Sequence, residues 1–312
     1  MSDLLSPLKI NSLRKTYKGG QQAVKGVSFD VKPGEIFGLL GPNGAGKTTI
    51  ISTITTLEQP SSGTVEVFGK DVSQHPNFTK KQLGVVHQEV INSGFFDVEE
   101  ILNFQSGYYG IRKNKERIDF LLHKLSLYEH RRKKVKQLSG GMKRRLMIAK
   151  ALVHTPKLLL LDEPTAGVDI GLRETLWQFV RELRAEGMSI LLTTHYLQEA
   201  EELCDRIAII NLGNLETVGE TKALVQQYTQ KKIRLTLTEK FPIKTSYVFF
   251  QEGSDYSFLV PPGKPMGEFL NELQIPLSLI ADVKIEEGNL EEAFMKVLRA
   301  PNQSSAVSGG AK

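Results

Sequence analysis

One short segment constrains this chain more than any other. Residues 41–49 read GPNGAGKTT, which fits the pattern Gly, four residues, Gly-Lys-Thr. An apolar run at 35–40 precedes it, and a segment with helical character follows at 49–57, so the sequence predicts a strand, a glycine-rich loop and a helix in succession. In that arrangement backbone N–H groups and the helix N-terminus form a binding site for phosphate. We expect the chain to bind a nucleoside triphosphate.

The residue types of this loop predict individual roles. Lys47 is expected to reach the β- and γ-phosphates, and the Thr48 hydroxyl is expected to ligate Mg²⁺. The glycines allow the backbone to approach the phosphate closely. The residues expected to bind the nucleotide here are Gly41, Pro42, Asn43, Gly44, Ala45, Gly46, Lys47, Thr48 and Thr49.

A second motif is a run of four leucines at 158–161 followed by Asp162, Glu163 and Pro164. The leucines predict a buried strand, and the carboxyl end of such a strand lies beside the phosphate loop in folds of this class. Asp162 can there hold Mg²⁺ through water. Glu163 is placed to accept a proton from the water that attacks the γ-phosphate.

A third motif is LSGGMKRRL at residues 138–146. Ser139 is a favourable N-cap, and the apolar spacing after it predicts a helix. With Gly140 and Gly141, the start of this helix is a second candidate site for an anion. Alone, the Ser-Gly-Gly segment is equally typical of a plain helix cap.

Short apolar strands alternate with helices along most of the chain. This pattern indicates an α/β fold with a mostly parallel sheet and helices on its faces. We expect one large domain over residues 1–229, with a largely helical part at about 89–155. The predicted strands are two within 8–32 and one each at 64–68, 83–86, 157–162, 189–194 and 206–211, and the predicted helices include 172–185 and 199–203.

The composition changes near residue 229. Beyond it, β-rich segments and two short helices predict a small α+β domain over residues 230–300. Residues 301–312 are rich in Ser and Gly and poor in apolar residues, which predicts a disordered tail. We find no internal repeat, so we expect one nucleotide site per chain.

Composition excludes several other classes of protein. No apolar run approaches the roughly 18–20 residues that span a bilayer, and the start of the sequence lacks the pattern of a secretory signal. The single cysteine, Cys204, cannot form an internal disulfide and is compatible with a reducing cytosol.

The net charge is +5, and basic residues cluster at 131–134 and 143–145. Such clusters can face acidic lipid headgroups or nucleic acid. Solvated helix faces are the more common explanation, and we expect that here.

The combination of motifs resembles the ATP-binding cassette family over about residues 8–225. As in that family, the segment at 138–142 lies between the phosphate loop and the Leu-Leu-Leu-Leu-Asp-Glu strand. The resemblance implies a mixed sheet with flanking helices, a helical subdomain that carries the signature, and ATP and Mg²⁺ as ligands.

Four more residues match motifs of that family. Gln88 resembles its glutamine loop, which implies contact with the nucleotide and the metal, although His87 stands where a proline is common. Asp169, at the end of Ala-Gly-Val-Asp, resembles its aspartate loop, and His195 its switch histidine. Tyr17 resembles the aromatic residue that stacks on adenine, and it lies on a predicted turn between two strands.

Family resemblance also implies a mechanism that needs two copies. Two cassettes face each other head to tail, and Ser139 and Gly141 of one contact the γ-phosphate bound by the other. Hydrolysis by Glu163, supported by His195, then opens the dimer. Because this chain has the acid, the histidine and the signature glycines, a homodimer is expected to have two competent sites.

The sequences of several segments are similar to those of exporter ATPases of the daunorubicin-resistance type and of bacterial YadG-like ATPases. These segments are 106–110, 141–151, 166–169, 193–204 and 288–294. The resemblance implies an ATPase at the cytoplasmic face of the cell membrane, bound to a separate polytopic membrane subunit, with no nucleic acid partner.

Two other functions fit part of the sequence. Cassette ATPases that act on ribosomes or DNA usually have two cassettes in one chain or a long coiled-coil insertion, and this sequence has neither. A simple P-loop kinase would leave the Ser-Gly-Gly segment and His195 without a role. The transported substrate is not readable from the sequence.

Overall fold

The computed structural model describes residues 5–87, 94–165, 170–242, 247–261 and 264–299. The chain forms two compact units, Met1–Glu220 and Thr221–Lys312, each described here by itself. The expected boundary lay after residue 229. The helix α8 (Thr221–Tyr228) groups with the C-terminal unit because it packs against α10 (Leu290–Arg299).

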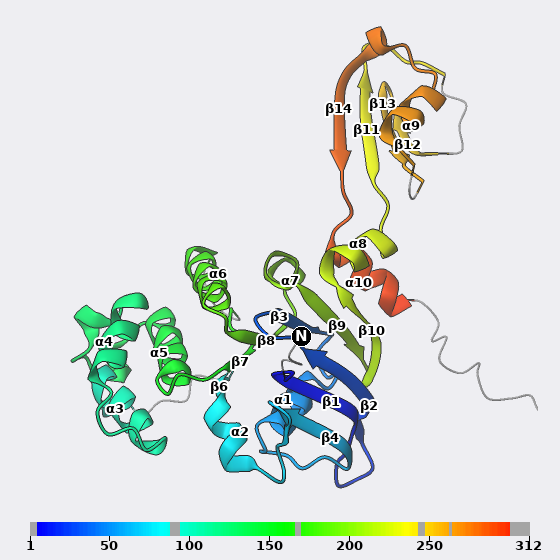
Figure 1. The fold of residues 1–312 in the computed structure, drawn as a ribbon. Coiled ribbons are helices and arrows are strands. Elements are labelled where there is room, and N and C mark those ends of the chain that lie inside the picture. The colour runs from blue at the N-terminus through cyan, green and yellow to red at the C-terminus, as the bar shows by residue number, and fades with distance from the viewer. Residues whose placement is uncertain (1–4, 88–93, 166–169, 243–246, 262–263, 300–312) are drawn as a thin grey trace, which may run out of the picture. The chain divides into compact units, whose positions relative to one another are not determined.

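The strands of the first unit form two sheets in the described part of the chain (Figure 1). One has four antiparallel strands in the order β2-β1-β4-β5. The other has six strands in the order β10-β9-β3-β8-β7-β6, of which only β10 runs antiparallel to its neighbour. The strands are β1 (Leu8–Thr16), β2 (Gln22–Val31), β3 (Ile36–Leu40), β4 (Ser62–Val67), β5 (Lys70–Asp71), β6 (Leu83–Val86), β7 (Leu158–Asp162), β8 (Ser189–Thr194), β9 (Arg206–Asn211) and β10 (Asn214–Glu220).

The central strands β3, β7 and β8 are buried along their whole length. Their continuous apolar sequences are typical of parallel strands that are covered on both faces. Because β3 pairs with β8 and β8 pairs with β7, the carboxyl ends of the three strands lie next to one another. These ends lead into the segments from which the phosphate loop, His195 and the Asp162–Glu163 pair were predicted.

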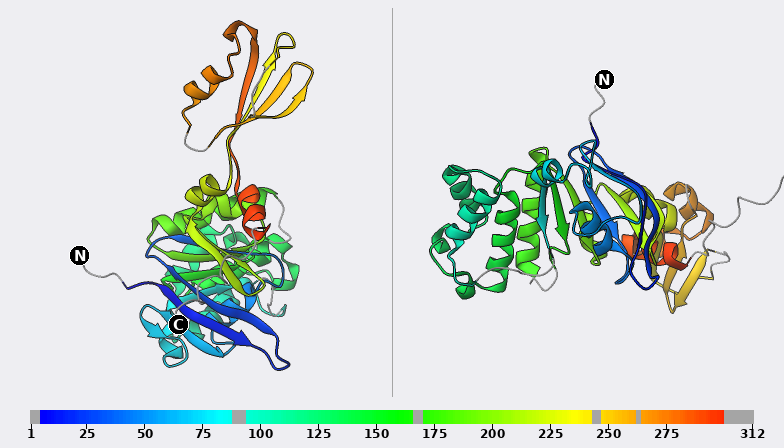
Figure 2. Two further views of the ribbon diagram at one scale, coloured as in Figure 1. Left: turned by 90° about the vertical axis from the view of Figure 1, so that its right-hand side faces the viewer. Right: turned by 90° about the horizontal axis from the view of Figure 1, so that it is seen from below.

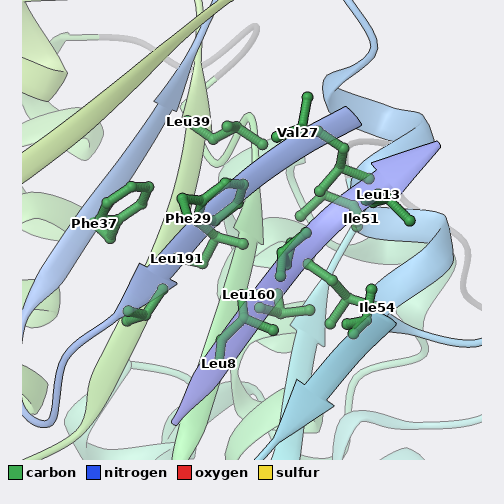
Figure 3. Packing of buried hydrophobic residues seen from close by; sticks show 14 of the residues in the cluster. Leu8, Leu13, Val27, Phe29, Phe37, Leu39, Ile51, Ile54, Leu160 and Leu191 are labelled. Atoms are coloured by element: carbon green, nitrogen blue, oxygen red, sulfur yellow. The ribbon is translucent and has the colours of Figure 1, made fainter. Parts of the chain in front are cut away.

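The main core of this unit lies between the two sheets (Figure 3). Phe29 of β2 stacks on Phe37 of β3, with 5.1 Å between the ring centroids. Ile51 and Ile54 of α1 (Lys47–Ile54) are buried in the same cluster. Each fully buried side chain of this size contributes about 1.5–3 kcal/mol. The helix that follows the phosphate loop is therefore anchored by the core.

A group of helices forms a separate part of the first unit, at the left of Figure 1 and in the right-hand view of Figure 2. It contains α3 (Val98–Tyr108), α4 (Lys115–Lys124) and α5 (Gly140–Leu152), so the expectation of a helical part is confirmed for these residues. Asp97 begins α3 with a capping box, in which its side chain accepts from the Glu100 N–H. The remaining helices of the unit are α2 (Pro76–Gln82), α6 (Ile170–Ala185) and α7 (Leu197–Leu203).

The C-terminal unit contains a four-stranded antiparallel sheet among its described residues, in the order β12-β13-β11-β14. Its own core joins Ile233, Leu235, Tyr256 and Phe258 of the sheet to Phe269 of the helix α9. This arrangement confirms the α+β class that the sequence predicts. The elements are β11 (Lys232–Leu237), β12 (Val248–Glu252), β13 (Asp255–Leu259), α9 (Met266–Glu272) and β14 (Ile280–Glu286).

No helix in the portion that the structure describes combines the length and the apolar character needed to cross a bilayer. The tail expected at 301–312 lies outside the described residues.

The packing of α5 against β6 makes a specific prediction. A Cβ atom at Gly84 would lie 2.5 Å from the backbone oxygen of Ala151, so Gly84→Ala should destabilise the first unit by about 1–3 kcal/mol. A Cβ atom at Gly107, in α3, would meet no atom within 4 Å. Gly107→Ala should therefore stabilise this helix by up to about 1 kcal/mol. Urea unfolding measures both, and equal stability of the two variants would contradict this packing.

Candidate nucleotide site

The loop between β3 and α1 has the backbone that a phosphate site requires. Gly44 and Gly46 have positive φ angles of 81° and 109°. A Cβ atom at Gly46 would lie 2.5 Å from the Ala23 backbone oxygen, and one at Gly41 would lie 2.3 Å from the Ile210 oxygen. Because these neighbours are backbone atoms that cannot move aside, only glycine fits. Gly44, in contrast, faces open space.

Lys47, the first residue of α1, is buried inside the loop. Its Nζ donates to the backbone oxygens of Gly41 at 2.6 Å and Pro42 at 3.2 Å. Burial lowers the pKa of this amine, whereas the nearby charges of Glu163 and Asp162 raise it and favour the ammonium form. The loop thus holds a cation at the helix N-terminus, where an anionic ligand is favoured.

A cleft of about 680 Å³ opens over this loop. Tyr17 lies on one of its walls, on the turn between β1 and β2, and its hydroxyl is 3.3 Å from Thr49 Oγ1. Lys15 Nζ lies 5.1 Å from the centre of the Tyr17 ring. The lining residues are Tyr17, Gln21, Gln22, Ala23, Lys25, Asn43, Gly44, Ala45, Gly46, Lys47, Thr48, Thr49, Glu163, His195 and Leu212.

The acidic pair lies at the end of β7, as the leucine run predicts. Asp162 is buried, and its Oδ1 accepts from the Thr193 hydroxyl at 2.5 Å. Glu163 has a φ of 46°, and its N–H donates to the Thr193 backbone oxygen at 3.0 Å. A glutamate in the left-handed region of backbone conformation is strained, so hydrogen bonds to the neighbouring strand must hold the backbone of Glu163 in this conformation. This turn directs the Glu163 side chain into the cleft rather than into the sheet.

His195 follows β8, the neighbour of β7. Its Nδ1 lies 3.2 Å from Oε2 of Glu163, and 40% of its side chain is exposed, against 11% for Glu163. The Tyr196 N–H donates to the Thr194 hydroxyl at 3.0 Å, which fixes the backbone just after the histidine. The tertiary structure therefore joins the acid and the histidine in one pair above the phosphate loop.

The predicted signature begins α5 and does not line this cleft. Ser139 caps the helix, with its Oγ accepting from the Met142 N–H at 3.3 Å. Gly140 and Gly141 are the first two residues of the helix. Figures 1 and 2 show α5 in the helical part, away from α1. The predictions for Gln88 and Asp169 fall on residues outside the described ranges.

Arg144 shows that the expectation of a solvated face at 143–145 is wrong for this residue. Its side chain is buried, and burial lowers the pKa of the guanidinium while the charge of Asp162 opposes that effect. The guanidinium group of Arg144 donates hydrogen bonds to backbone oxygens on two segments of the chain. Within the described ranges these are His87 at 2.7 Å, Asp162 at 3.2 Å, Glu163 at 2.8 Å and Pro164 at 2.8 Å.

The sequence did contain a signal for this role. Arg144 lies four and eight residues before the buried Ile148 and Leu152, so it shares the inward face of α5. Thr193, which holds both Asp162 and Glu163, carried no such signal, because a threonine in an apolar strand is unremarkable in sequence. Their contact follows from the register that places Asp162 opposite Thr193.

The fold and this site define a P-loop nucleoside triphosphatase. The phosphate loop, the acidic strand end and the histidine lie at the carboxyl ends of adjacent parallel strands, where ligands bind in open α/β sheets.

Comparison with known proteins narrows this class. Residues 24–166 match the family described as ABC transporter. The chain is 41% identical over 224 residues to the Nod factor export ATP-binding protein I of Burkholderia orbicola (strain AU 1054), covering 71% of this chain and 73% of that protein. It is also 41% identical over 214 residues to the linearmycin resistance ATP-binding protein LnrL of Bacillus subtilis (strain 168), covering 68% of each.

Solved structures agree. An ATP-binding subunit of an ABC transporter matches with a TM-score of 0.67 at 29% identity, over 72% of this chain and 93% of that one. A dimeric, post-hydrolysis ATP-binding cassette bound to ADP and phosphate matches with a TM-score of 0.63 at 26% identity, over 68% and 98%. The chain belongs to the ABC transporter family, and it is an ATPase of that family.

The contacts of Arg144 predict a kinetic effect. Arg144→Lys keeps the positive charge but removes the planar guanidinium group that makes several hydrogen bonds at once. Loss of charged hydrogen bonds worth about 1.5–3 kcal/mol should lower kcat for ATP hydrolysis roughly 10- to 100-fold. The KM for ATP should change little, because Arg144 does not line the cleft. Arg145→Lys is the matched control, since Arg145 bonds the Leu125 backbone oxygen in the helical part. A parent-like kcat for Arg144→Lys would contradict this role.

Proposed function

We propose that this protein is the ATP-hydrolysing subunit of an exporter and works with a separate membrane-spanning partner. The observation that carries the proposal is the Glu163–His195 pair, which faces Lys47 across one cleft at the end of the parallel sheet. Export rather than import is supported by the relatives, which are named for Nod factor export and linearmycin resistance.

The residues of the cleft have different roles in ATP hydrolysis. Lys47 and the N–H groups of the loop bind the phosphates. Glu163 accepts a proton from the attacking water, and His195 orients the carboxylate and shares the proton at Nδ1. Tyr17 provides an aromatic face at the cleft wall for the adenine ring.

Magnesium fits the oxygen atoms of this site. Thr48 is exposed at the start of α1, and Asp162 offers a second carboxylate oxygen besides the one that Thr193 holds. Hard oxygen ligands of this kind are those that Mg²⁺ prefers, with the remaining positions taken by water and phosphate. When bound, the ion neutralises charge on the β- and γ-phosphates. Gln88 is proposed as a further ligand.

Two copies complete the site. Ser139, Gly140 and Gly141 form a capped helix start, where the first N–H groups have no partner within the helix, and none of the three lines the cleft of its own chain. We assign them to the γ-phosphate held by a second copy, with Asp169 beside them, in a head-to-tail dimer. A dimeric cassette among the similar structures supports this arrangement.

The helical part offers a docking surface for the membrane partner. Phe95, Phe104 and Tyr108 are 82%, 48% and 85% exposed, and Phe96 packs edge-on against Phe104. A groove of about 530 Å³ is lined by Tyr108 and Tyr109. Of the exposed aromatic residues Tyr108 lies beside this groove, and exposed aromatic side chains are typical of protein interfaces. The proposal places the protein at the cytoplasmic face of the membrane through this contact.

The role of Glu163 is tested by Glu163→Gln. Loss of a general base should lower hydrolysis by about 10²–10⁴-fold, while ATP binding is kept and the ATP-bound dimer accumulates. Single-turnover hydrolysis and light scattering with ATP measure the two effects. The exposed Glu202→Gln, in α7, should behave as the parent does. Hydrolysis at the parent rate in Glu163→Gln would refute the assignment.

Docking is tested by replacing Phe95 and Tyr108 with serine in the tagged chain. The double variant should no longer recover a polytopic protein from detergent-solubilised membranes, because the apolar contact area is lost. Leu277→Ser is the control, since Leu277 is 80% exposed but lies in the C-terminal unit. If the double variant recovers the membrane partner as well as the parent does, the partner docks on a different surface.

A further inference from the structure

The strand β14 leaves one edge of the C-terminal sheet open. It is the last strand in the order β12-β13-β11-β14 and pairs only with β11 among the described residues (Figure 1). Its side chains are exposed or partly exposed along its whole length. An open edge with free N–H and C=O groups is a template for another strand.

The hydrogen bonds of β11 show which groups of β14 are free. The Leu237 N–H donates to Ser254 on the β13 side, and the Thr238 N–H donates to Leu279 on the β14 side. Since these directions alternate along a strand, Arg234 and Thr236 bond β14, and their partners Lys284 and Asp282 face β11. The backbone groups of Val283 and Ile285 therefore point outward.

Val283 and Ile285 also form an apolar strip beside the core of this sheet. Val283 lies opposite the buried Leu235, and Ile285 lies opposite the buried Ile233, so both share the face that α9 covers elsewhere. They are nevertheless 43% and 50% exposed. Both edge strands contain a register shift, but β14 keeps five regularly paired residues after it, 282–286, whereas β12 keeps three, 250–252.

The charges of β14 select a partner and a register. In an antiparallel pair of two β14 strands centred on Val283, Lys284 of each copy lies opposite Asp282 of the other. Centring on Asp282 or on Lys284 would place like charges opposite each other, which is destabilising. Centring on Ile285 overlaps only residues 284–286, whereas centring on Val283 overlaps residues 280–286, with the register shift at Ala281 opposite Ile285 of the second copy.

We propose that β14 binds β14 of a second copy of this chain, as an antiparallel pair with its two-fold axis at Val283. The four strands of each copy then form one continuous sheet, and the strips of Val283 and Ile285 from both copies adjoin. In the single chain the Val283 N–H donates to Oδ1 of Asp282 at 2.9 Å. Pairing replaces this bond with one to the second strand and frees Asp282 for Lys284, whose Nζ lies 3.5 Å from Glu286 Oε1 in the single chain. This contact needs no ATP, and it holds two copies together while the nucleotide-dependent contact is open.

Cysteine cross-linking of the full chain without nucleotide tests the register. A Val283→Cys pair at the axis would have Cα atoms about 5.5 Å apart, within the range of a disulfide, so oxidation should give a band of twice the mass. Ile285→Cys residues would lie about 14 Å apart and should not cross-link. The native Cys204 is buried, so the parent should remain uncross-linked. Absence of the Val283→Cys product, or preferential cross-linking at Ile285, would overturn the proposal.

A charge exchange tests it without cysteines. Lys284→Asp should abolish the nucleotide-free dimer in light scattering, because it places a second carboxylate opposite Asp282 at both ends of the pair. The double variant Asp282→Lys/Lys284→Asp should restore it, and Glu252→Lys on the β12 edge should leave it unchanged. A double variant that stays monomeric refutes the pairing. ATP-dependent dimerisation of Glu163→Gln is scored separately, so failure of one proposal is distinguishable from failure of the other.

Discussion

The ATP site depends on the parallel pairing of β3, β8 and β7. Because parallel strands present their carboxyl ends at one edge, the segments after them converge although they are far apart in the sequence. The register pairs Leu40 with Thr194 and Asp162 with Thr193. A shift of one residue would turn the Thr193 side chain to the other face of the sheet and remove its contact with Asp162. The apolar sequences of these strands thus determine the chemistry by fixing this register.

The site also concentrates buried charge, and the structure balances it locally. Asp162 and Glu163 lie between Lys47 in the loop and Arg144 in α5, both of which are buried. Burying single charges in this way would be costly, so each is satisfied by hydrogen bonds. Arg144 uses backbone oxygens, one of them on His87 beside the proposed glutamine loop. It thereby connects the signature helix, the acidic strand end and the segment leading to Gln88 within one chain.

The C-terminal unit has its own hydrophobic core. Its buried residues pack among themselves, and the nucleotide cleft is lined only by residues of the first unit, within the part of the chain that the structure describes. Under the proposal that β14 pairs with a second copy, changes in the C-terminal unit act on association rather than on the nucleotide cleft. An exposed apolar edge strand is a liability in an isolated protein, and a specific second strand removes it.

The sequence alone determined the features that depend on residue type at fixed spacing. The phosphate loop, the leucine strand with its acids, the Ser139 cap and the α/β and α+β classes are all of this kind, because a turn, a cap or a buried strand is selected by its neighbours in the chain. It missed β10, whose polar sequence pairs with β9 at the edge of the sheet, and it set the domain boundary after residue 229, whereas α8 groups with the C-terminal unit through its packing against α10. Tertiary structure alone decided the Glu163–His195 pair, the burial of Arg144 and the open edge of β14. Each of these depends on which strands and helices become neighbours, and long-range packing sets that order rather than local sequence.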